Sequence, residues 1–219
     1  MALSHNLTDL ARTVASTVAA TCMIAFTAAA QEPADRYDQA ALLETGALED
    51  RVLGEPDAPV TIIEYASMTC PHCAAFHENV YPGIKENYID TGKSRLIFRE
   101  YPLDRLAVAT SMLARCVDED RFFPFISILF DQRDLWVVQE PVEPLKNLAK
   151  QAGLNDEAFD KCLSNQELLD GIDWIQNRGR TEFDVGGTPS FFVNGEFVAA
   201  ERAQSVDQFS EIIEKHLGE

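Results

Sequence analysis

The amino-acid sequence predicts an α/β fold into which an all-helical subdomain is inserted. Strand and helix signals alternate in two outer segments, 59–103 and 181–219, whereas the segment between them, 104–180, carries only helical signals. A short run of β-branched and aromatic residues is typical of a buried strand, and apolar residues repeated every three or four positions indicate a helix. The two outer segments are therefore expected to form one sheet with its helices, and the middle segment a separate helical layer.

The first outer segment predicts a strand, a helix and a second strand. The run VTIIEYA at 60–66 predicts the first strand, and SRLIFREY at 94–101, which Pro102 ends, predicts the second. The sequence between them predicts a helix with a kink at Pro82 and an end at Gly92. Two strands joined through a helix are expected to be parallel, with a right-handed connection.

The inserted segment predicts a series of helices. They are one through Leu106, Ala109, Leu113 and Cys116, one that begins at 122 with Pro124 in its first turn, one over 145–152 that Gly153 ends, one that Asn155 caps, and one from Leu168 toward Gly179. We expect the aromatic residues of this segment, Trp136 and Trp174 included, to lie in its core rather than in a peptide-binding groove.

The second outer segment predicts a β-hairpin and a closing helix. The turn Asn194-Gly195 separates two short apolar runs, which is a strong short-range signal for a hairpin. Ser205 and Gln208 have the spacing of a capping box, so the last helix is expected to begin there.

The composition limits the partners that the chain can have. Its 219 residues are 46% hydrophobic, enough for a sizeable core, and carry a formal net charge of −18. Nucleic-acid binding requires a basic face that neutralises phosphates, and anionic membrane surfaces attract basic segments. We therefore expect no nucleic-acid partner and no docking on a membrane surface.

Residues 1–30 predict a secretory signal peptide. An uncharged run begins at Val14, and Ala28 and Ala30 stand in the A-x-A arrangement of a cleavage site, so cleavage is expected after Ala30. One alternative is an uncleaved membrane anchor, but the run is rich in Ala and Thr and is weakly hydrophobic for a stable span. The other is a lipoprotein signal that uses Cys22, but Ala19 stands where lipid attachment needs a leucine-like residue. The sequence thus predicts export, with an acidic lead-in over 31–58 before the first strand.

Export changes the interpretation of the cysteines. Removal of Cys22 with the signal peptide leaves Cys70, Cys73, Cys116 and Cys162, and an even number in an oxidising compartment favours disulfides over a zinc cluster. The close spacing of Cys70 and Cys73 makes them natural partners, which leaves Cys116 to pair with Cys162. The alternative for the second pair is two buried, reduced thiols. A disulfide there would mainly stabilise the fold.

The motif at 70–73, Cys-Pro-His-Cys, has the features of a reactive thiol pair. Cys70 falls where a strand passes into a helix, so unpaired N–H groups and the helix dipole favour its thiolate. Pro71 suits a first helical turn, and His72 adds a donor beside the sulfur. A stabilised thiolate favours the reduced form, so the disulfide becomes an oxidant.

These residues carry a family resemblance. The stretches EYASMTCPHC and VGGTPSFFVNG resemble the DsbA-type thiol:disulfide oxidoreductases, and the resemblance covers most of the chain after about residue 50. The resemblance implies a thioredoxin fold with an inserted helical subdomain, and the CPHC motif is associated with strongly oxidising members. It also implies periplasmic localisation and no metal or organic cofactor.

The resemblance places a substrate-binding loop opposite the cysteines. It implies a cis peptide bond before Pro189, with the backbone of Thr188 free to pair with an extended substrate chain. Gly186 and Gly187 are expected to supply the turn before it. The alternative is an ordinary entry from a loop into a strand.

The resemblance also singles out Glu64, in the middle of the first strand. An acid at that place lies beneath the second cysteine in the family and moves protons as it reacts, a task for which burial raises the pKa. Arg99 or Glu100 on the neighbouring strand is the expected partner. The alternative is an acid at a strand edge that faces water.

His77 follows Cys73 by one helical turn, so Cys70, Cys73 and His77 could imitate metal ligands. A structural site needs four ligands, and besides His72 and His77 the histidines are His5, in the predicted signal peptide, and His216, near the C-terminus. We therefore interpret His77 as a surface residue and predict no metal site.

The sequence thus predicts an exported, monomeric dithiol oxidase. It is expected to donate the Cys70–Cys73 disulfide to unfolded secreted proteins through a mixed disulfide on Cys70, and to be reoxidised by a DsbB-type, quinone-linked membrane protein. One alternative is a disulfide isomerase or reductase, because Thr188 before the proline also occurs among isomerases, although residues 31–55 offer few helical residues for an oligomerisation arm. A metal-binding thioredoxin-like protein is the other.

Overall fold

The computed structural model of the protein describes residues 37–218. The predicted signal peptide, residues 1–30, and its cleavage site lie outside the described residues and stay a prediction. Within residues 37–218, no helix is both long and apolar enough to span a membrane.

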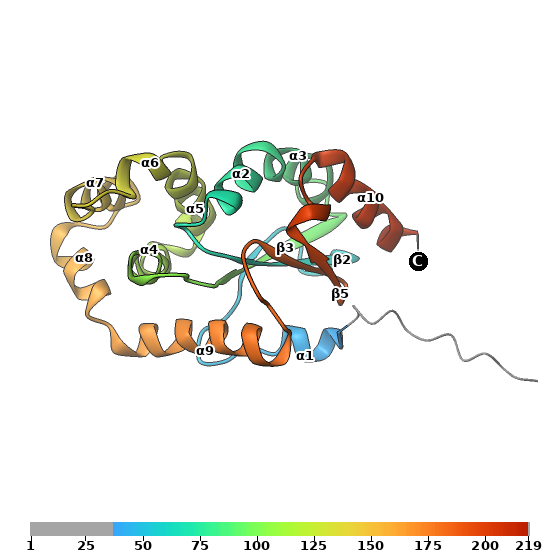
Figure 1. Cartoon of the computed structure of the whole chain (residues 1–219), viewed down its shortest axis with the longest axis horizontal. Helices are drawn as coiled ribbons and strands as arrows, with labels where there is room; N and C mark the ends of the chain where they lie inside the picture. Colours follow the sequence, from blue (N-terminus) through green and yellow to red (C-terminus); the bar gives the residue numbers. More distant parts are fainter. Residues whose placement is uncertain (1–36, 219) are drawn as a thin grey trace, which may run out of the picture. The chain divides into compact units, whose positions relative to one another are not determined.

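A five-stranded sheet forms the centre of the described part, in the order β1-β3-β2-β4-β5 (Figure 1). Its strands are β1 (Arg51–Leu53), β2 (Val60–Ala66), β3 (Ser94–Glu100), β4 (Ser190–Val193) and β5 (Glu196–Ala199). The central strand β2 is parallel to β3 and antiparallel to β4, and β4 pairs antiparallel with β5. These pairings confirm the predicted parallel pair and the predicted hairpin. Every residue of β2 is buried, as expected of a strand with helices on both faces.

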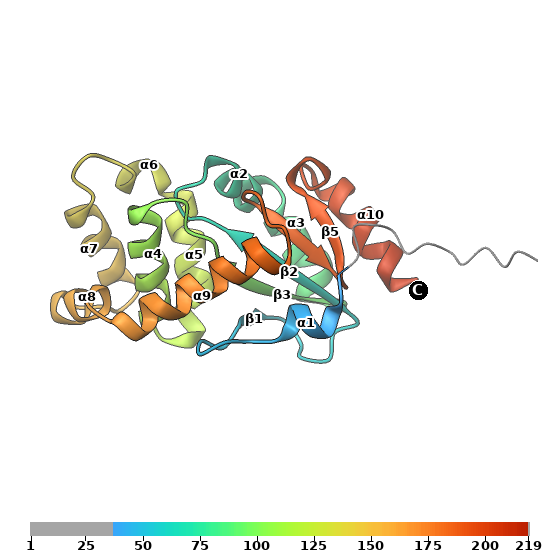
Figure 2. The ribbon, with the colours of Figure 1, turned by 60° about the horizontal axis from the view of Figure 1, so that its bottom comes forward.

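Helices cover both faces of the sheet (Figures 1 and 2). On one face lie α2 (Pro71–Asn79), α3 (Tyr81–Ile84), a π-helical turn (Lys85–Ile89) and α10 (Val206–Leu217), and on the other lie α1 (Gln39–Leu43) and α9 (Gln166–Glu182). Because strand side chains alternate between faces, Ile62 packs with the first group and Ile63 with the second.

The inserted helices lie in the sequence between β3 and β4. They are α4 (Arg105–Cys116), a 3₁₀ turn (Glu119–Arg121), α5 (Phe122–Asp131), α6 (Arg133–Trp136), α7 (Val142–Gln151) and α8 (Asp156–Leu163), followed by α9. Their core also contains Met68, Cys70 and Cys73. The cysteine motif therefore lies at the boundary between the sheet and the inserted helices, which make up one wall around it.

Several details differ from the sequence-based expectations. Helix α9 continues past Gly179 to Glu182. At this glycine the helix packs closely on Tyr65, whose Cε1 would be 2.8 Å from an added Cβ. The expected kink at Pro82 is a break at Val80, after which Pro82 occupies the first turn of α3. Trp136 is fully buried, as predicted, but Trp174 is 38% exposed, so its assignment to the core was wrong.

The predicted capping box at the start of α10 forms only in part. The Ser205 hydroxyl accepts from the Gln208 N–H at 3.2 Å, as a cap should. The Gln208 side chain, however, accepts from the N–H of Gln204 rather than from that of Ser205.

The lead-in before the first predicted strand is more structured than its sequence suggests. It contains α1 and the edge strand β1, which pairs antiparallel with β3. Three buried arginines from other elements hold it. Arg178 donates to the carbonyls of Ala41 and Glu44, Arg99 pairs with Asp50, and Arg115 donates to the carbonyl of Glu49. These contacts join segments far apart in sequence, and for that reason local patterns did not reveal them.

Candidate active site

Cys70 occupies the N-cap position of α2, immediately after the loop that follows β2. Its backbone is extended, with φ −74° and ψ 122°, and Pro71 begins the helix. The first-turn N–H groups of the helix therefore point toward the Cys70 side chain. The Cys70 Sγ lies 3.3 Å from the carbonyl oxygen of Thr188, and only 5% of the residue is exposed.

The two thiols of the motif differ strongly in acidity. Hydrogen bonds to Cys70, first from the Cys73 thiol and then from Thr188 and the backbone N–H groups of Cys73 and His72, outweigh burial and lower its pKa to about 5. Burial raises the pKa of Cys73 well above the ordinary range, and the neighbouring Cys70 and Glu64 charges raise it further. Cys70 is thus the thiolate at neutral pH, and Cys73 holds a proton.

His72 acts on the motif through its backbone. Its side chain is exposed, and it stabilises the Cys70 thiolate through its backbone N–H rather than through its ring. The imidazole instead lines a groove of about 300 Å³ together with Phe76, Pro189 and Ala203. On the other side of α2, Pro71 lines a second groove, of about 530 Å³.

The peptide bond between Thr188 and Pro189 is cis, and it places the Thr188 carbonyl against Cys70. The Thr188 Oγ1 is buried and makes no other hydrogen bond, so it is free to donate to the Cys70 thiolate. In the preceding turn the left-handed residue is Asp184, with φ 53°, whereas an added Cβ on Gly187 would meet nothing within 4 Å. The carbonyl of Gly187 accepts from the Ser190 hydroxyl at 2.8 Å.

Glu64 is completely buried on the central strand, which excludes the water-facing alternative. Its partner is neither Arg99 nor Glu100, which pair with Asp50 and Arg115. Both carboxylate oxygens lie 3.1 Å from the Nε2 of His77 instead.

The interpretation of His77 as a surface residue was therefore wrong. The residue is 5% exposed and its ring stacks on Phe130 at 4.3 Å. The sequence does hold a signal for it: Cys73, Phe76, His77 and Val80 follow the i, i+3, i+4, i+7 spacing of a buried helix face, and all four are buried. A histidine on such a stripe needs a polar partner, and Glu64 supplies it.

A metal site has little support in this arrangement. Within residues 37–218, no group of three or more His, Cys, Asp or Glu side chains is placed to hold an ion. The His77 nitrogen that faces Glu64 is already engaged.

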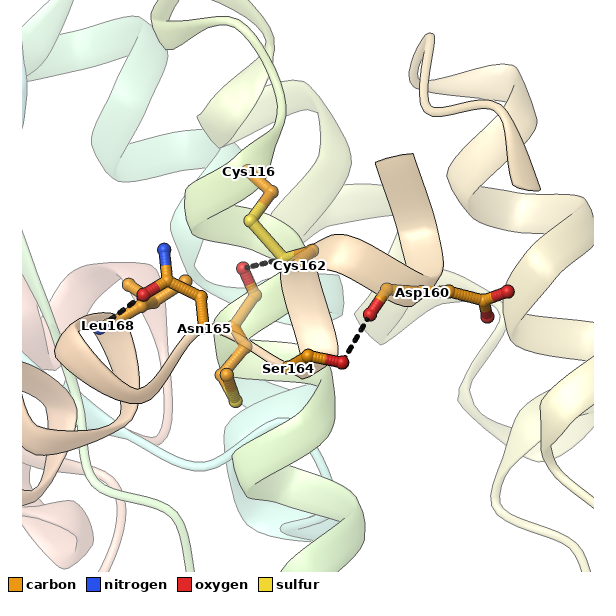
Figure 3. The surroundings of a disulfide bond; sticks show 7 residues. Cys116, Asp160, Cys162, Ser164, Asn165 and Leu168 are labelled. Atoms are coloured by element: carbon orange, nitrogen blue, oxygen red, sulfur yellow. Dashed lines mark hydrogen bonds between the residues drawn. A yellow bond between two sulfur atoms is a disulfide. The ribbon is translucent and has the colours of Figure 1, made fainter. Parts of the chain in front are cut away.

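The second cysteine pair forms a disulfide inside the inserted helices (Figure 3). It joins Cys116, the last residue of α4, to Cys162 near the end of α8, 46 residues later. The Cys162 Sγ lies 3.1 Å from the carbonyl oxygen of Met112 in α4. The bridge thus fixes two helices that contact each other along the inserted segment.

The comparisons with known proteins agree with this geometry. A family model described as Thioredoxin matches residues 47–215. The crystal structure of Wolbachia pipientis alpha-DsbA1 matches with a TM-score of 0.72 and 32% identity, over 81% of this chain and 96% of that one. A "Putative protein-disulfide oxidoreductase" of Rickettsia bellii is 36% identical over 172 residues, which are 78% of this chain and 65% of the relative.

A third relative is a "Probable disulfide bond formation protein D" of Bacillus anthracis, 30% identical over 153 residues, with 65% of this chain and 69% of the relative covered. The chain thus spans slightly less than two thirds of the Rickettsia relative and most of the Wolbachia structure. On these matches, the chain belongs to the thioredoxin family, among the DsbA-type thiol:disulfide oxidoreductases.

Proposed function

We propose that this protein is an exported thiol oxidase that transfers the Cys70–Cys73 disulfide to unfolded proteins. The observation that carries the proposal is the difference in acidity between the two thiols, with the pKa of Cys70 near 5 and that of Cys73 well above the ordinary range. A thiolate this stable favours the reduced dithiol, so the disulfide is readily given away.

The disulfide is transferred in two steps, and in the second step Cys70 is the sulfur that leaves. A substrate thiolate attacks the Cys70 Sγ, a substrate–Cys70 disulfide forms, and the bond to Cys73 breaks with its electron pair on Cys73, which takes up a proton. A second substrate thiolate then attacks the substrate sulfur of the mixed disulfide. The substrate leaves with its own disulfide, and Cys70 leaves as the stabilised thiolate, so the protein gains the two electrons that the substrate loses.

In this proposal, Glu64 and His77 influence the protonation of Cys73. The Cys73 sulfur is released into a buried site, where an uncompensated thiolate is costly. The Glu64 charge raises the pKa of Cys73 and so favours its protonation. Glu64 thus helps to keep Cys73 neutral once the disulfide has been given away, and His77 compensates the buried carboxylate.

Substrate binding is assigned to the cis-proline loop and the groove beside it. Thr188 and Pro189 border Cys70, and the groove lined by Phe76 and Ala203 is largely apolar. An extended chain can lie there and pair with the Thr188 backbone, with few demands on its side chains. This suits substrates that are many and unfolded.

Regeneration of the disulfide requires an electron acceptor outside this chain. We assign that role to a DsbB-type, quinone-linked membrane protein, by resemblance to the family. The same attack in reverse passes electrons from the Cys70–Cys73 dithiol to the partner's disulfide and restores the oxidised pair. Export, which this assignment requires, rests on the predicted signal peptide.

The test is the redox equilibrium of the pair, combined with trapping of the intermediate. In glutathione buffers the pair should equilibrate at about −120 mV, as strong oxidants do, rather than at about −270 mV like thioredoxin. The oxidised protein should oxidise reduced, unfolded ribonuclease A, and Cys73→Ser should retain a mixed disulfide between Cys70 and glutathione.

The alternatives give different results in the same experiments. A reductase would equilibrate near or below the potential of thioredoxin, and an isomerase would reactivate scrambled ribonuclease faster than it oxidises the reduced form. A Cys70→Ser variant that still oxidises ribonuclease would refute the assignment of the nucleophile. A reduced protein that holds one metal ion per chain would favour the metal-binding alternative.

A further inference from the structure

Two side chains from the inserted helices hold Thr69, the residue before Cys70. The guanidinium of Arg133, at the start of α6, donates to the Thr69 carbonyl from Nε at 3.0 Å and from Nη2 at 2.7 Å. The Thr69 hydroxyl donates to the Asp104 carboxylate, at the start of α4, at 2.7 Å. The peptide that leads into the reactive cysteine is therefore fixed by the insertion on two sides.

Both anchors are held in place by further contacts. Helix α6 is tied down by Trp136, which is fully buried and donates from Nε1 to the Leu129 carbonyl at 2.8 Å. Asp104 is the N-cap of α4 and accepts from the Ala107 N–H at 2.8 Å. Thr69 itself is 9% exposed, so water does not readily replace these contacts.

We propose that Arg133 is a positioning residue of the thiol–disulfide reaction, with Asp104 acting against it. The Arg133 guanidinium, bound to the Thr69 carbonyl, holds a positive charge at the peptide that enters Cys70, and this charge favours the Cys70 thiolate. Asp104 holds the same residue from the other side with a negative charge. Through these two contacts the inserted helices set how readily Cys70 leaves. The proposal rests on the redox role proposed above for Cys70.

Arg133 binds the peptide before Cys70 with two donors. Its two donors meet one carbonyl oxygen, which polarises the Thr69–Cys70 peptide. Its third contact, from Nη1 to Asp134 at 3.3 Å, goes to a side chain that is 97% exposed and is therefore weak.

Other titratable groups around Cys70 come from each neighbouring element. Cys73 and the exposed His72 belong to α2, and the buried Glu64 on β2 acts through Cys73. Asp131 borders the groove beside Pro71. The contacts of Thr69 bring one cation, Arg133, to the peptide before Cys70. Removal of its charge should therefore change the pKa of Cys70.

The test compares variants whose effects should have opposite signs. In Arg133→Gln, which loses the charge, the pKa of Cys70, followed by the ultraviolet absorbance of the thiolate, should rise by about half a pH unit. The equilibrium with glutathione should shift about threefold toward the oxidised protein. Arg133→Lys, which keeps the charge, should recover most of the shift. Asp104→Asn keeps an acceptor for the cap and should lower the pKa.

A matched control separates this effect from a general loss of charge. Arg121 lies in the insertion as well and donates to a carbonyl, that of Ala152, at 3.3 Å. Arg121→Gln should leave the pKa of Cys70 and the glutathione equilibrium unchanged. If Arg133→Gln behaves like this control, the proposal is wrong.

If Arg133→Gln and Asp104→Asn shift the pKa in the same direction, loosening of the loop is the cause and the positioning role fails. Failure of the proposed function would look different. It would appear in the unmodified protein as a pair that does not exchange reversibly with glutathione, or as one with a potential near that of thioredoxin.

Discussion

The two cysteine pairs of this chain belong to one apolar core cluster, and yet their surroundings differ. Exposure does not separate them, because Cys70 is 5% exposed and Cys162 is 3% exposed. The difference lies in polar contacts. At the helix start, the Cys73 thiol and the backbone N–H groups of Cys73 and His72 donate to the Cys70 sulfur, whereas the Cys162 sulfur is bonded to Cys116 and lies 3.1 Å from the Met112 carbonyl, which offers no proton. Reactivity in this fold thus follows from unequal stabilisation of the two sulfurs rather than from access alone.

The spacing of the pairs adds to the contrast. A bridge between residues 46 positions apart removes much conformational freedom from the unfolded chain, whereas a bridge between Cys70 and Cys73 removes little. One pair is suited to stability and the other to exchange.

The largest effect is expected from removal of the second bridge. Cys116→Ser combined with Cys162→Ser should lower the free energy of unfolding by about 4 kcal/mol, because the unfolded chain regains the freedom that the bridge removes. Oxidation of reduced ribonuclease by this variant should be retained below its unfolding transition. Guanidinium unfolding and the ribonuclease assay measure the two quantities.

The matched variant is Cys70→Ser combined with Cys73→Ser. It should lose the oxidase activity. Its free energy of unfolding should be no lower than that of the oxidised protein, because the short bridge contributes little to stability. If instead the Cys116 and Cys162 substitutions abolish exchange with the fold intact, the division of roles between the pairs is wrong.

The pH dependence of the potential is the next largest effect. Above about pH 5 Cys70 stays a thiolate, so reduction of the disulfide takes up one proton, on Cys73. The potential should then fall by about 30 mV per pH unit, against about 59 mV when two protons are taken up. Measurement in dithiol buffers from pH 4 to pH 8 should show the change of slope near pH 5.

The stability of the reduced protein should depend on the ionisation of the same thiol, that of Cys70. A depressed pKa stabilises the folded dithiol fully above the pKa of an unfolded thiol, and this contribution is lost as the pH falls through about 5. The difference in the free energy of unfolding between the reduced and the oxidised form should therefore fall between pH 8 and pH 5. A uniform slope of about 59 mV per pH unit throughout would contradict the low pKa of Cys70.

Much of this site could be predicted because its signals are local. The strand VTIIEYA, the helix that starts at Pro71 and the hairpin at Asn194 each depend on neighbouring residues. The contacts that were missed are between distant segments. Glu64 and His77 are 13 residues apart, and Thr69 and Arg133 are 64 apart, so no pattern within one helix or strand reveals them.

The remaining errors have the same origin. The three residues of β1 become a strand only because β3 offers them an edge, and their own pattern is too short to predict it. Trp174 stays partly exposed because it packs against Gly46 in the lead-in rather than into the helical core, and an added Cβ on that glycine would lie 2.6 Å from the indole.

The smallest effect is expected at Cys73, the less reactive sulfur. Glu64→Gln removes a buried charge that raises the pKa of Cys73, and the amide oxygen can still accept from His77. The pKa of Cys73 should fall by about one pH unit, the size of effect that a close buried charge exerts. It should be measured by ultraviolet titration in a Cys70→Ala background.

Glu78→Gln is the matched control for this change. Glu78 lies on the same helix as Cys73, but it is exposed, and water screens its charge. This variant should leave the pKa of Cys73 where it is. If Glu64→Gln only lowers the unfolding temperature and the pKa of Cys73 does not move, Glu64 stabilises the core and does not control the protonation of Cys73. The difference between the two sulfurs would then arise from burial and from the helix start alone.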